Sequence, residues 1–350
     1  MARLFEVGIT RDLLRADGTD GPWGVGLDVL HRHPGVRTVY LGEDAAGLRP
    51  DHVRGLDALA LFAPKVTGET LRGADCLAIL ARLGVGYDSV DIAACTRHGV
   101  LVTITPDAVR RPMATAILAM MLGLSHRQWQ KDRITRAGHG WSRRSDYFGM
   151  GLTGRVLGSI GLGNIGREVF VLARPLEMRH LAYAPRATAA QAAPFGVELV
   201  TLETLLHESD VLVVACPLTP ETHHLLDAER LALLKPTAFV VNAARGPIID
   251  QAALTDALRA ERIAGAALDV FEQEPVDAAD PILGLENVIL SPHALCWTDE
   301  CARQIGRSAA EAILDVAAGR VPRHVVNREA IETPRVREKL RRYREQAEAA

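Results

Sequence analysis

The sequence predicts an α/β fold with two domains, each a parallel sheet flanked by helices. Its 350 residues are enough to bury two separate cores. Short apolar segments of strand length alternate with longer segments of helical pattern along most of the chain, which is typical of parallel βαβ units. One of these units carries the glycine-rich turn GLGNIG between its strand and its helix.

The composition is that of an ordinary globular protein, with 48% hydrophobic and 24% charged residues. A net charge of −3 provides no general attraction to nucleic acid or to an anionic membrane, so we expect neither as a partner. The basic segment RVREKLRRYREQ near the C-terminus is interspersed with glutamate, which favours a solvated helix over a nucleic-acid site.

The cysteines and the N-terminal segment lead us to expect a cytoplasmic protein. No two cysteines have C-x-x-C spacing, so we expect neither a metal site nor a disulfide framework. The segment MARLFEVGIT contains no apolar signal core, and no apolar run reaches the length of a membrane span. The five cysteines are Cys76, Cys95, Cys216, Cys296 and Cys301.

The first third of the chain is predicted to form one sheet, and the C-terminal segment is expected to belong to the same domain. We assign residues 1–106 and 319–350 to this domain, because the tail after the last predicted helix is expected to return to it. A helix ending in glycine, SVDIAACTRHG, precedes the fifth strand. The predicted strands are FEVGIT, TVYL, ALALFA, CLAILA and VLVTI.

A second series of strands and helices is predicted to form an inserted domain, residues 107–318. It begins with a long apolar helix from about Arg111 and the irregular stretch RAGHGWSRRSDYFGMG, and its last helix is DECARQIGRSAAEAILDVAAG. Its six predicted strands, which would complete a nucleotide-binding sheet, are RVLGSI, RHLAYA, DVLVVAC, AFVVNAA, IAGAALDV and NVILSPH.

The turn GLGNIG has the context of a phosphate-binding site, since a strand runs into it and a helix follows. Gly161 would permit the tight turn, Gly163 would let a pyrophosphate approach the backbone, and Gly166 would let helix and strand pack closely. The amides of Asn164 and Ile165 would then bind the pyrophosphate. The alternative, glycines that serve packing alone, does not explain this strand–helix context.

Six motifs in a fixed order, between about Leu83 and Asn327, resemble the D-isomer-specific 2-hydroxyacid dehydrogenase family, which includes glyoxylate/hydroxypyruvate reductases and 3-phosphoglycerate dehydrogenases. The resemblance implies two Rossmann-like domains, with the cofactor domain inserted in a flavodoxin-like substrate domain. It also implies a homodimer that interconverts a 2-keto acid and a D-2-hydroxy acid by hydride transfer with NAD or NADP. The motifs are GVGYDSVD (84–91), GLGNIG (161–166), CPLTPETHHLL (216–226), NAARGPIID (242–250), ALDVFEQEP (267–275) and SPH (291–293).

The family's catalytic trio corresponds to Arg245, Glu274 and His293. Hydride transfer to a keto acid builds negative charge on its oxygen, and the resemblance makes His293 the general acid and, in reverse, the general base. Glu274 would raise the pKa of the imidazole, and Arg245 would bind the substrate carboxylate. Each alone is more simply a surface residue, but all three follow predicted strands, where α/β sheets bind ligands.

Further contacts follow from the resemblance. The backbone amides of Val85 and Gly86 would bind the substrate carboxylate, and Arg82 either adds positive charge there or is solvated. Asp269 would lie beside the nicotinamide carboxamide. The remaining cofactor contacts would be Cys216, Pro217, Thr222, Ala243 and Ala244, together with Arg245 and His293.

The apolar helix from Met113 and the stretch after it correspond to the family's dimer contact. Trp129, Trp141 and Tyr147 would be interface residues, and the alternative for them is ordinary packing. The stretch Met113-Ala114-Thr115 stands where relatives usually carry Val-Ala-Glu, so the surface around this helix differs from theirs.

One departure concerns the cofactor. Relatives often have Tyr-Asp-Pro where this chain has Tyr183-Ala184-Pro185, followed by Arg186. Losing the aspartate removes an acceptor for the ribose hydroxyl and a charge that repels a 2′-phosphate, and Arg186 could pair with that phosphate. These changes slightly favour NADP over NAD. The alternative is an Arg186 that points into solvent and an Ala184 that merely tolerates NAD.

Two tryptophans could shape the substrate pocket. Trp297, four residues after His293, either walls the pocket, closes onto the nicotinamide or packs between domains. Trp23, in the irregular stretch RDLLRADGTDGPWGVG, either reaches the cleft or packs within a surface loop. The sequence does not identify the side chain of the keto acid, and we favour small unphosphorylated acids such as glyoxylate or hydroxypyruvate.

Two other functions stay open at this point. Phosphite oxidation is one, since relatives that perform it keep a similar trio, whereas formate dehydrogenases place Gln where Glu274 stands. A dinucleotide-sensing protein like the family's corepressors is the other, although no partner-binding extension is visible. A methyltransferase that uses the glycine turn would not explain the arginine, glutamate and histidine.

Overall fold

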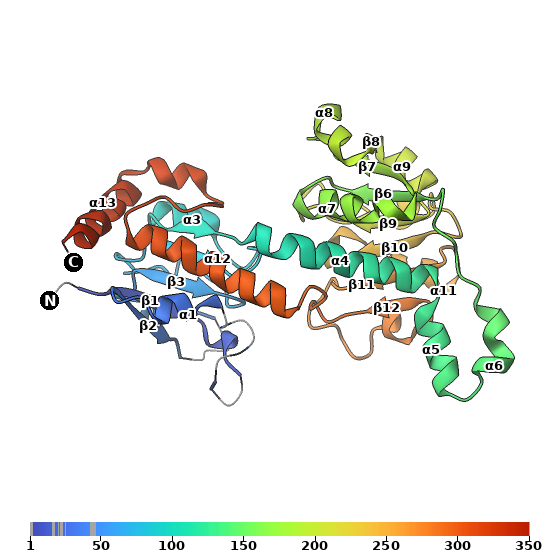
Figure 1. Cartoon of the computed structure of the whole chain (residues 1–350), viewed down its shortest axis with the longest axis horizontal. Helices are drawn as coiled ribbons and strands as arrows, with labels where there is room; N and C mark the ends of the chain where they lie inside the picture. Colours follow the sequence, from blue (N-terminus) through green and yellow to red (C-terminus); the bar gives the residue numbers. More distant parts are fainter. Residues whose placement is uncertain are drawn as a thin grey trace. The chain divides into compact units, whose positions relative to one another are not determined.

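The computed structural model describes residues 3–15, 18–19, 21, 24, 26–42 and 47–349 (Figure 1). Trp23 lies outside these residues. The chain divides into two compact units, which we call unit 1 (residues 1–109 and 297–350) and unit 2 (residues 110–296). Each is a parallel sheet flanked by helices, so the α/β class expected from the sequence is confirmed.

Unit 1 is built on a five-stranded parallel sheet in the order β2-β1-β3-β4-β5, the order of flavodoxin-like folds. All five strands expected from the first third of the chain are present, and every residue of β3 and β5 is buried. The strands are β1 (Phe5–Ile9), β2 (Val36–Tyr40), β3 (Ala58–Leu61), β4 (Ile79–Arg82) and β5 (Leu101–Thr103).

Helix α12 (Asp299–Ala317) belongs to unit 1, whereas the sequence led us to place it at the end of the inserted domain, at residue 318. The reason is its buried face, which packs on β3 and β4. The backbones are in close contact there, since a Cβ on Gly306 would lie 2.7 Å from the Cα of Gly26. The other α-helices of this unit are α1 (Asp28–His31), α2 (Pro50–Val53), α3 (Ile92–Arg97) and α13 (Pro334–Glu348).

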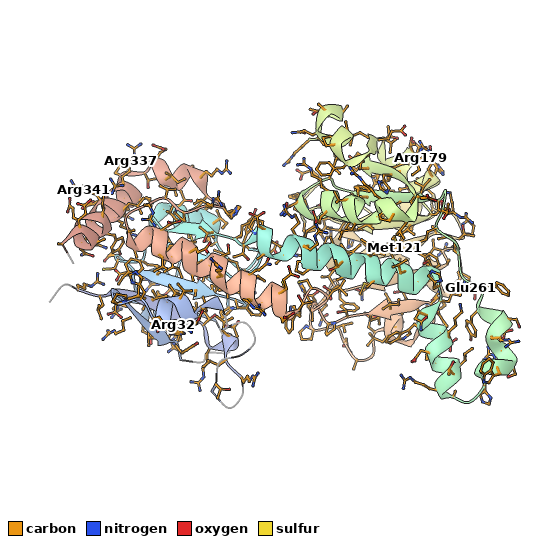
Figure 2. The ribbon with its side chains drawn as sticks, in the orientation of Figure 1. Arg32, Met121, Arg179, Glu261, Arg337 and Arg341 are labelled. Carbon is orange, nitrogen blue, oxygen red and sulfur yellow. The ribbon has the colours of Figure 1, made fainter. Side chains whose placement is uncertain are left out.

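Helix α13 is only partly the solvated helix that its alternating charges predict. Arg337 and Arg341 lie on its outer side (Figure 2). On the inner side, the buried hydroxyl of Tyr343 donates to Oδ1 of Asp57 (2.8 Å). The Lys339 ammonium donates to three backbone carbonyls, and burial lowers its pKa to about 8. These buried polar contacts fix the helix to the sheet of unit 1.

Unit 2 contains a seven-stranded parallel sheet in the order β12-β11-β10-β9-β6-β7-β8. The six predicted strands are present. The sequence did not predict β8, a strand of three residues at the edge of the sheet, where it pairs with β7 alone. The strands are β6 (Val156–Ile160), β7 (Arg179–Tyr183), β8 (Val197–Leu199), β9 (Val211–Val214), β10 (Phe239–Asn242), β11 (Gly265–Leu268) and β12 (Val288–Leu290).

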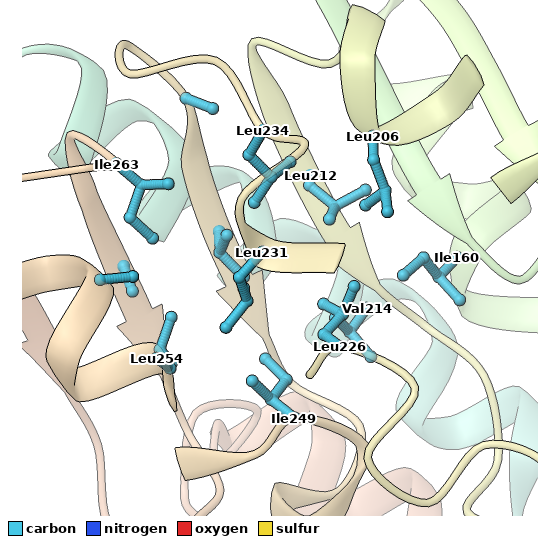
Figure 3. Close-up of a cluster of buried hydrophobic side chains, with 14 of the residues drawn as sticks. Ile160, Leu206, Leu212, Val214, Leu226, Leu231, Leu234, Ile249, Leu254 and Ile263 are labelled. Carbon is cyan, nitrogen blue, oxygen red and sulfur yellow. The ribbon is translucent and has the colours of Figure 1, made fainter. Parts of the chain in front are cut away.

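Two apolar clusters cover the two faces of this sheet. One packs Leu212 of β9 and Ile160 of β6 against helix residues such as Leu206 (Figure 3). The other contains Met121 and Phe170 from the helices on the opposite face. Those helices are α4 (Pro106–Ser125), which begins earlier than predicted, and α7 (Asn164–Ala173), and the remaining ones are α5 (Gln128–Arg136), α6 (Gly140–Arg143), α8 (Ala189–Ala192), α9 (Leu202–Glu208), α10 (Ala228–Leu231) and α11 (Gln251–Arg259).

No helix in the described part of the chain has the length and apolar character that crossing a bilayer requires. Within the same described residues, no group of three or more histidine, cysteine, aspartate or glutamate side chains is arranged to hold a metal ion.

Candidate active site

The glycine turn lies where the order of the unit 2 sheet reverses, between β6 and its neighbours β7 and β9, which is where open α/β sheets bind ligands. Gly161 has a φ of +104°, and a Cβ there would lie 2.6 Å from the Ala215 carbonyl oxygen. A Cβ on Gly166 would lie 2.9 Å from the Gly161 oxygen. A Cβ on Gly163 would meet no described atom within 4 Å outside its chain neighbours, so this side of the backbone is open to a phosphate.

The ten-residue helix α7 begins at Asn164, directly after Gly163. The first amides of an α-helix lack partners within the helix and point along its axis, so this end can bind a pyrophosphate. The roles expected for Gly161, Gly163 and Gly166 therefore agree with the local geometry. These residues fit a bound dinucleotide.

Arg186 is exposed in the loop after β7, and the carbonyl of Tyr183 at the start of that loop accepts a hydrogen bond from the Gly161 amide (2.9 Å). A carboxylate that the sequence analysis did not single out, Glu221, lies in the loop after β9. A hydrogen bond from Thr219 lowers the pKa of Glu221, and the positive charge of Arg186 lowers it further. The two loops that flank the glycine turn thus carry opposite charges near each other.

Thr222 and Cys216 line the same loop after β9. The Thr222 hydroxyl donates to the Pro217 carbonyl (2.8 Å) and accepts from the amide of Thr219 (2.7 Å), so it holds the loop in shape. Burial raises the pKa of the Cys216 thiol to about 11, which keeps that side chain neutral. The loop after β9 is therefore held by the hydrogen bonds of Thr222 and carries the neutral side chain of Cys216.

The loop after β10 carries Arg245. The Asn242 side chain shapes this loop, because its Nδ2 donates to the Arg245 carbonyl (3.0 Å) and its Oδ1 accepts from the Ala244 amide (3.1 Å). The next residue, Gly246, lies against the loop after β11. A Cβ there would come within 1.9 Å of the Phe271 carbonyl, so only glycine fits. This contact brings Arg245 next to the loop that holds Glu274.

His293 and Glu274 form a hydrogen-bonded pair, with 2.8 Å between Nδ1 of the imidazole and Oε2 of the carboxylate. The second carboxylate oxygen of Glu274 accepts from the Phe271 amide (3.0 Å). His293 has a φ of +53°, and its amide donates to the Asp269 carbonyl (2.8 Å). The side chains of His293 and Glu274 are 48% and 37% exposed, so a ligand can reach them.

Asp269 has a structural role that the sequence analysis missed. Its buried carboxylate accepts hydrogen bonds from the amides of Ala294 (2.9 Å) and Leu295 (3.0 Å), directly after the catalytic histidine candidate. Burial raises the pKa of the Asp269 carboxyl and outweighs the hydrogen bonds, which lower that pKa. The side chain therefore fixes the turn that presents His293.

The charges around His293 are arranged to keep a proton on it. Its hydrogen bond to Glu274 raises the pKa of the imidazole, and this outweighs the effects of burial and of the Arg245 charge. For Glu274, burial raises the pKa, but the hydrogen bonds from His293 and the Phe271 amide, with the positive charges, lower it overall. The pairing thus favours the protonated form of His293 and the ionised form of Glu274.

In unit 1, the substrate residues expected from the sequence lie at the carboxyl end of β4 and in the loop that follows it. The amides of Val85 and Gly86 make no hydrogen bond within the described part of the chain, as an anion site requires. The Arg82 guanidinium lies 5.5 Å from the ring centre of Phe62. On the same ring, Trp297 packs at 6.3 Å, so this tryptophan belongs to unit 1.

The segment from α5 to Phe148 exposes large aromatic side chains. Trp129, Trp141 and Phe148 are 55%, 85% and 81% exposed. The guanidinium of Arg144 lies 5.6 Å from the ring centre of Trp141. Trp129, Trp141 and the half-buried Tyr147 were expected at an interface from the sequence, and Phe148 was not. Packing within the chain does not explain the exposure of Trp129, Trp141 and Phe148.

Comparison with known proteins places the chain in a family. The family model described as "D-isomer specific 2-hydroxyacid dehydrogenase, NAD binding domain" matches residues 118–294, which lie within unit 2. The glyoxylate reductase of Korarchaeum cryptofilum is 38% identical over 285 residues, which are 80% of this chain and 86% of that protein.

Solved structures give the same result for the fold. That of a putative D-isomer specific 2-hydroxyacid dehydrogenase from Polaromonas sp. JS6 66 superimposes with a TM-score of 0.78, at 30% identity, over 92% of this chain and 99% of that one. D-lactate dehydrogenase from Aquifex aeolicus, solved with NAD and lactic acid, superimposes with a TM-score of 0.77, at 27% identity, over 89% and 96%.

A nucleotide-binding sheet that presents a histidine paired with a carboxylate, close to the charge of an arginine, has the parts needed for hydride transfer to a carbonyl group. The class is therefore that of oxidoreductases using a nicotinamide dinucleotide. Within this class, the chain belongs to the D-isomer-specific 2-hydroxyacid dehydrogenase family. The family, the two Rossmann-like domains and the 2-keto acid/D-2-hydroxy acid interconversion expected from the sequence are thereby confirmed.

Proposed function

We propose that His293 exchanges the proton of the reaction, with Glu274 holding it and Arg245 binding the substrate. The 2.8 Å contact between Nδ1 of His293 and Oε2 of Glu274 carries this assignment. Because Nδ1 is engaged, Nε2 is the atom that delivers a proton to the carbonyl oxygen of a keto acid or removes it from a hydroxy acid. A bound nicotinamide dinucleotide supplies or accepts the hydride.

Arg245 serves two purposes in this proposal. Its guanidinium can pair with the substrate carboxylate and polarise the carbonyl as negative charge develops on the oxygen. In unit 1, the amides of Val85 and Gly86 make no hydrogen bond among the described residues, and we propose them as donors to an anionic substrate group, as the resemblance implies. We infer that small unphosphorylated 2-keto acids are the substrates, in line with the glyoxylate reductase among the relatives.

NADP is the cofactor we propose, because Ala184 stands where a ribose-binding aspartate is usual and Arg186 follows two residues later. The experiment measures oxidation of NADPH and NADH side by side, with glyoxylate, hydroxypyruvate, pyruvate and phenylpyruvate. We expect turnover with NADPH to exceed that with NADH. Arg186→Ala should raise KM for NADPH by about tenfold, the loss of a charge-assisted contact, and leave NADH within about twofold.

Arg179 provides the control for this variant. It lies at the other end of β7 and forms ion pairs with Glu198 and Glu208 (Figure 2). Arg179→Ala should change KM for neither NADPH nor NADH. An equal effect of Arg186→Ala on NADPH and NADH would reject the phosphate contact. Tight dinucleotide binding with no turnover of any keto acid would favour the sensor, and NAD(P) reduction by phosphite would favour the phosphite dehydrogenase.

We also propose that the protein is a homodimer that buries Trp129, Trp141 and Tyr147 with the exposed Phe148. Light scattering during gel filtration should give twice the chain mass of 37.9 kDa. The double variant Trp141→Ser/Phe148→Ser should run as a monomer. Val321→Ser, which alters another exposed apolar residue in a different unit, should remain dimeric. A dimer that survives the double variant would place the interface elsewhere.

A further inference from the structure

A second histidine–carboxylate pair lies in unit 2, outside the residues assigned so far. Nε2 of His224 is hydrogen-bonded to Oε1 of Glu272. His224 belongs to the loop after β9 and Glu272 to the loop after β11. The strand between these two is β10, whose loop carries Arg245. The pair therefore joins the loops on either side of the arginine.

His224 also holds the Arg245 loop through its backbone. Its amide donates to the carbonyl of Pro247 (2.8 Å), and two residues further the amide of Leu226 donates to that of Ile248 (3.1 Å). The φ of His224 is +48°, a conformation that costs energy in any residue with a β-carbon. His224 makes its contact with Glu272 from this backbone conformation.

Glu272 holds the same loop from the other side. Its Oε2 accepts from the amide of Gln251 (3.3 Å), and its own amide donates to the side-chain oxygen of Gln251 (2.9 Å). The backbone of Gly246 lies directly against the Phe271–Glu272 peptide. One carboxylate thus connects a residue before Arg245 with a residue after it, and does so two positions before Glu274.

We propose that His224 and Glu272 are positioning residues, which fix the Arg245 guanidinium relative to the His293–Glu274 pair. The proposal rests on the function proposed above, because it assigns the pair to the placement of the substrate-binding arginine. Neither residue touches substrate in it. A displacement of a binding group by about 1 Å can cost about 100-fold in rate, so a brace of this kind matters to turnover.

Two substitutions of His224 separate the effect of losing the contact with Glu272 from the effect of backbone strain. In His224→Asn, the new side chain tolerates the left-handed backbone but is too short to reach Glu272. In His224→Gln, the side-chain amide nitrogen takes the place of Nε2 of the imidazole. We expect His224→Asn to raise KM for the keto acid at least about tenfold, with the Kd of the dinucleotide within about twofold. His224→Gln should restore KM to within about threefold of the native value.

His223→Ala is the matched control, since its ring stacks on that of His224, at 4.1 Å between centroids, with no bond to Glu272. It should behave as the native enzyme. The inference is overturned if His224→Asn leaves KM unchanged, if His223→Ala has the same effect, or if only dinucleotide binding is lost. In the last case the pair serves the cofactor loop alone.

A second readout does not depend on turnover. Hydrogen exchange of the backbone amides of Arg245, Gly246, Ile248 and Ile249 should be at least about tenfold faster in His224→Asn than in His224→Gln or His223→Ala. Equal exchange in all three variants would reject the brace. If the native protein reduces no keto acid, the proposed function fails, and the exchange result still decides whether the pair holds this loop.

Discussion

His293→Asn should lower kcat for keto-acid reduction by roughly 10²- to 10⁴-fold, the range that proton transfer contributes in enzymes. Asparagine tolerates the positive φ of +53° at this position, so the turn after β12 should survive. The Kd of the dinucleotide, measured by fluorescence titration, should stay within about threefold of the native value. The loss would then lie in the chemical step and not in cofactor binding.

The control for this variant is His207→Asn, which changes an exposed histidine in α9. It should keep full activity. Retained turnover in His293→Asn would show that another group exchanges the proton. Loss of both turnover and dinucleotide binding would instead indicate that the turn held by Asp269 has collapsed, which circular dichroism and thermal unfolding of the variant would reveal.

Glu274→Gln should move the pH dependence of the reaction to lower pH. Reduction needs a protonated His293, so kcat/KM for the keto acid falls as the pH rises through the pKa of the imidazole. Glu274 raises that pKa, and the neutral glutamine no longer does. The falling limb should therefore lie at least about one pH unit lower in the variant, and activity near pH 8 should drop about tenfold or more.

The oxidation direction provides an internal check, because it needs the neutral imidazole as base. The rising limb of the oxidation profile should move to lower pH by the same amount. Compared with the native enzyme, the variant should therefore lose less hydroxy-acid oxidation at low pH than keto-acid reduction at high pH. A pH profile that does not move in either direction would contradict the assignment of Glu274, even if the overall rate falls.

The sequence predicted most strands because their apolar runs are continuous and buried. It missed β8, whose three residues pair along one edge only and provide too short a pattern to recognise. It assigned α12 to the inserted domain, whereas the helix clusters with unit 1, since an amphipathic pattern shows that a helix covers a core but not which core. The sequence also did not indicate that one side of α13 is buried, because Lys339 and Tyr343 are buried there through polar contacts.

The candidate site was predictable where a motif carries it. Arg245, Glu274 and His293 were found from NAARG, DVFEQEP and SPH, and the structure pairs the last two. The neighbours that shape the site were not predictable. Glu272 and Glu221 interact with side chains that are distant in the chain. Glu272 meets His224 when the loops after β9 and β11 come together, and Glu221 comes near Arg186 when the loops after β7 and β9 do. Spacing within a motif does not contain that information.

The division of the chain has a consequence for its synthesis on the ribosome. Unit 2 is one continuous segment and can fold as soon as it has emerged. The sheet of unit 1 is made first, yet α12 and α13, with the Lys339 and Tyr343 contacts, emerge only at the end. At about 5–20 residues per second, the first strands wait for roughly ten seconds or more without the helices that cover them. Until residues 299–317 have emerged, the face of β3 and β4 that α12 covers in the folded protein lacks this helix.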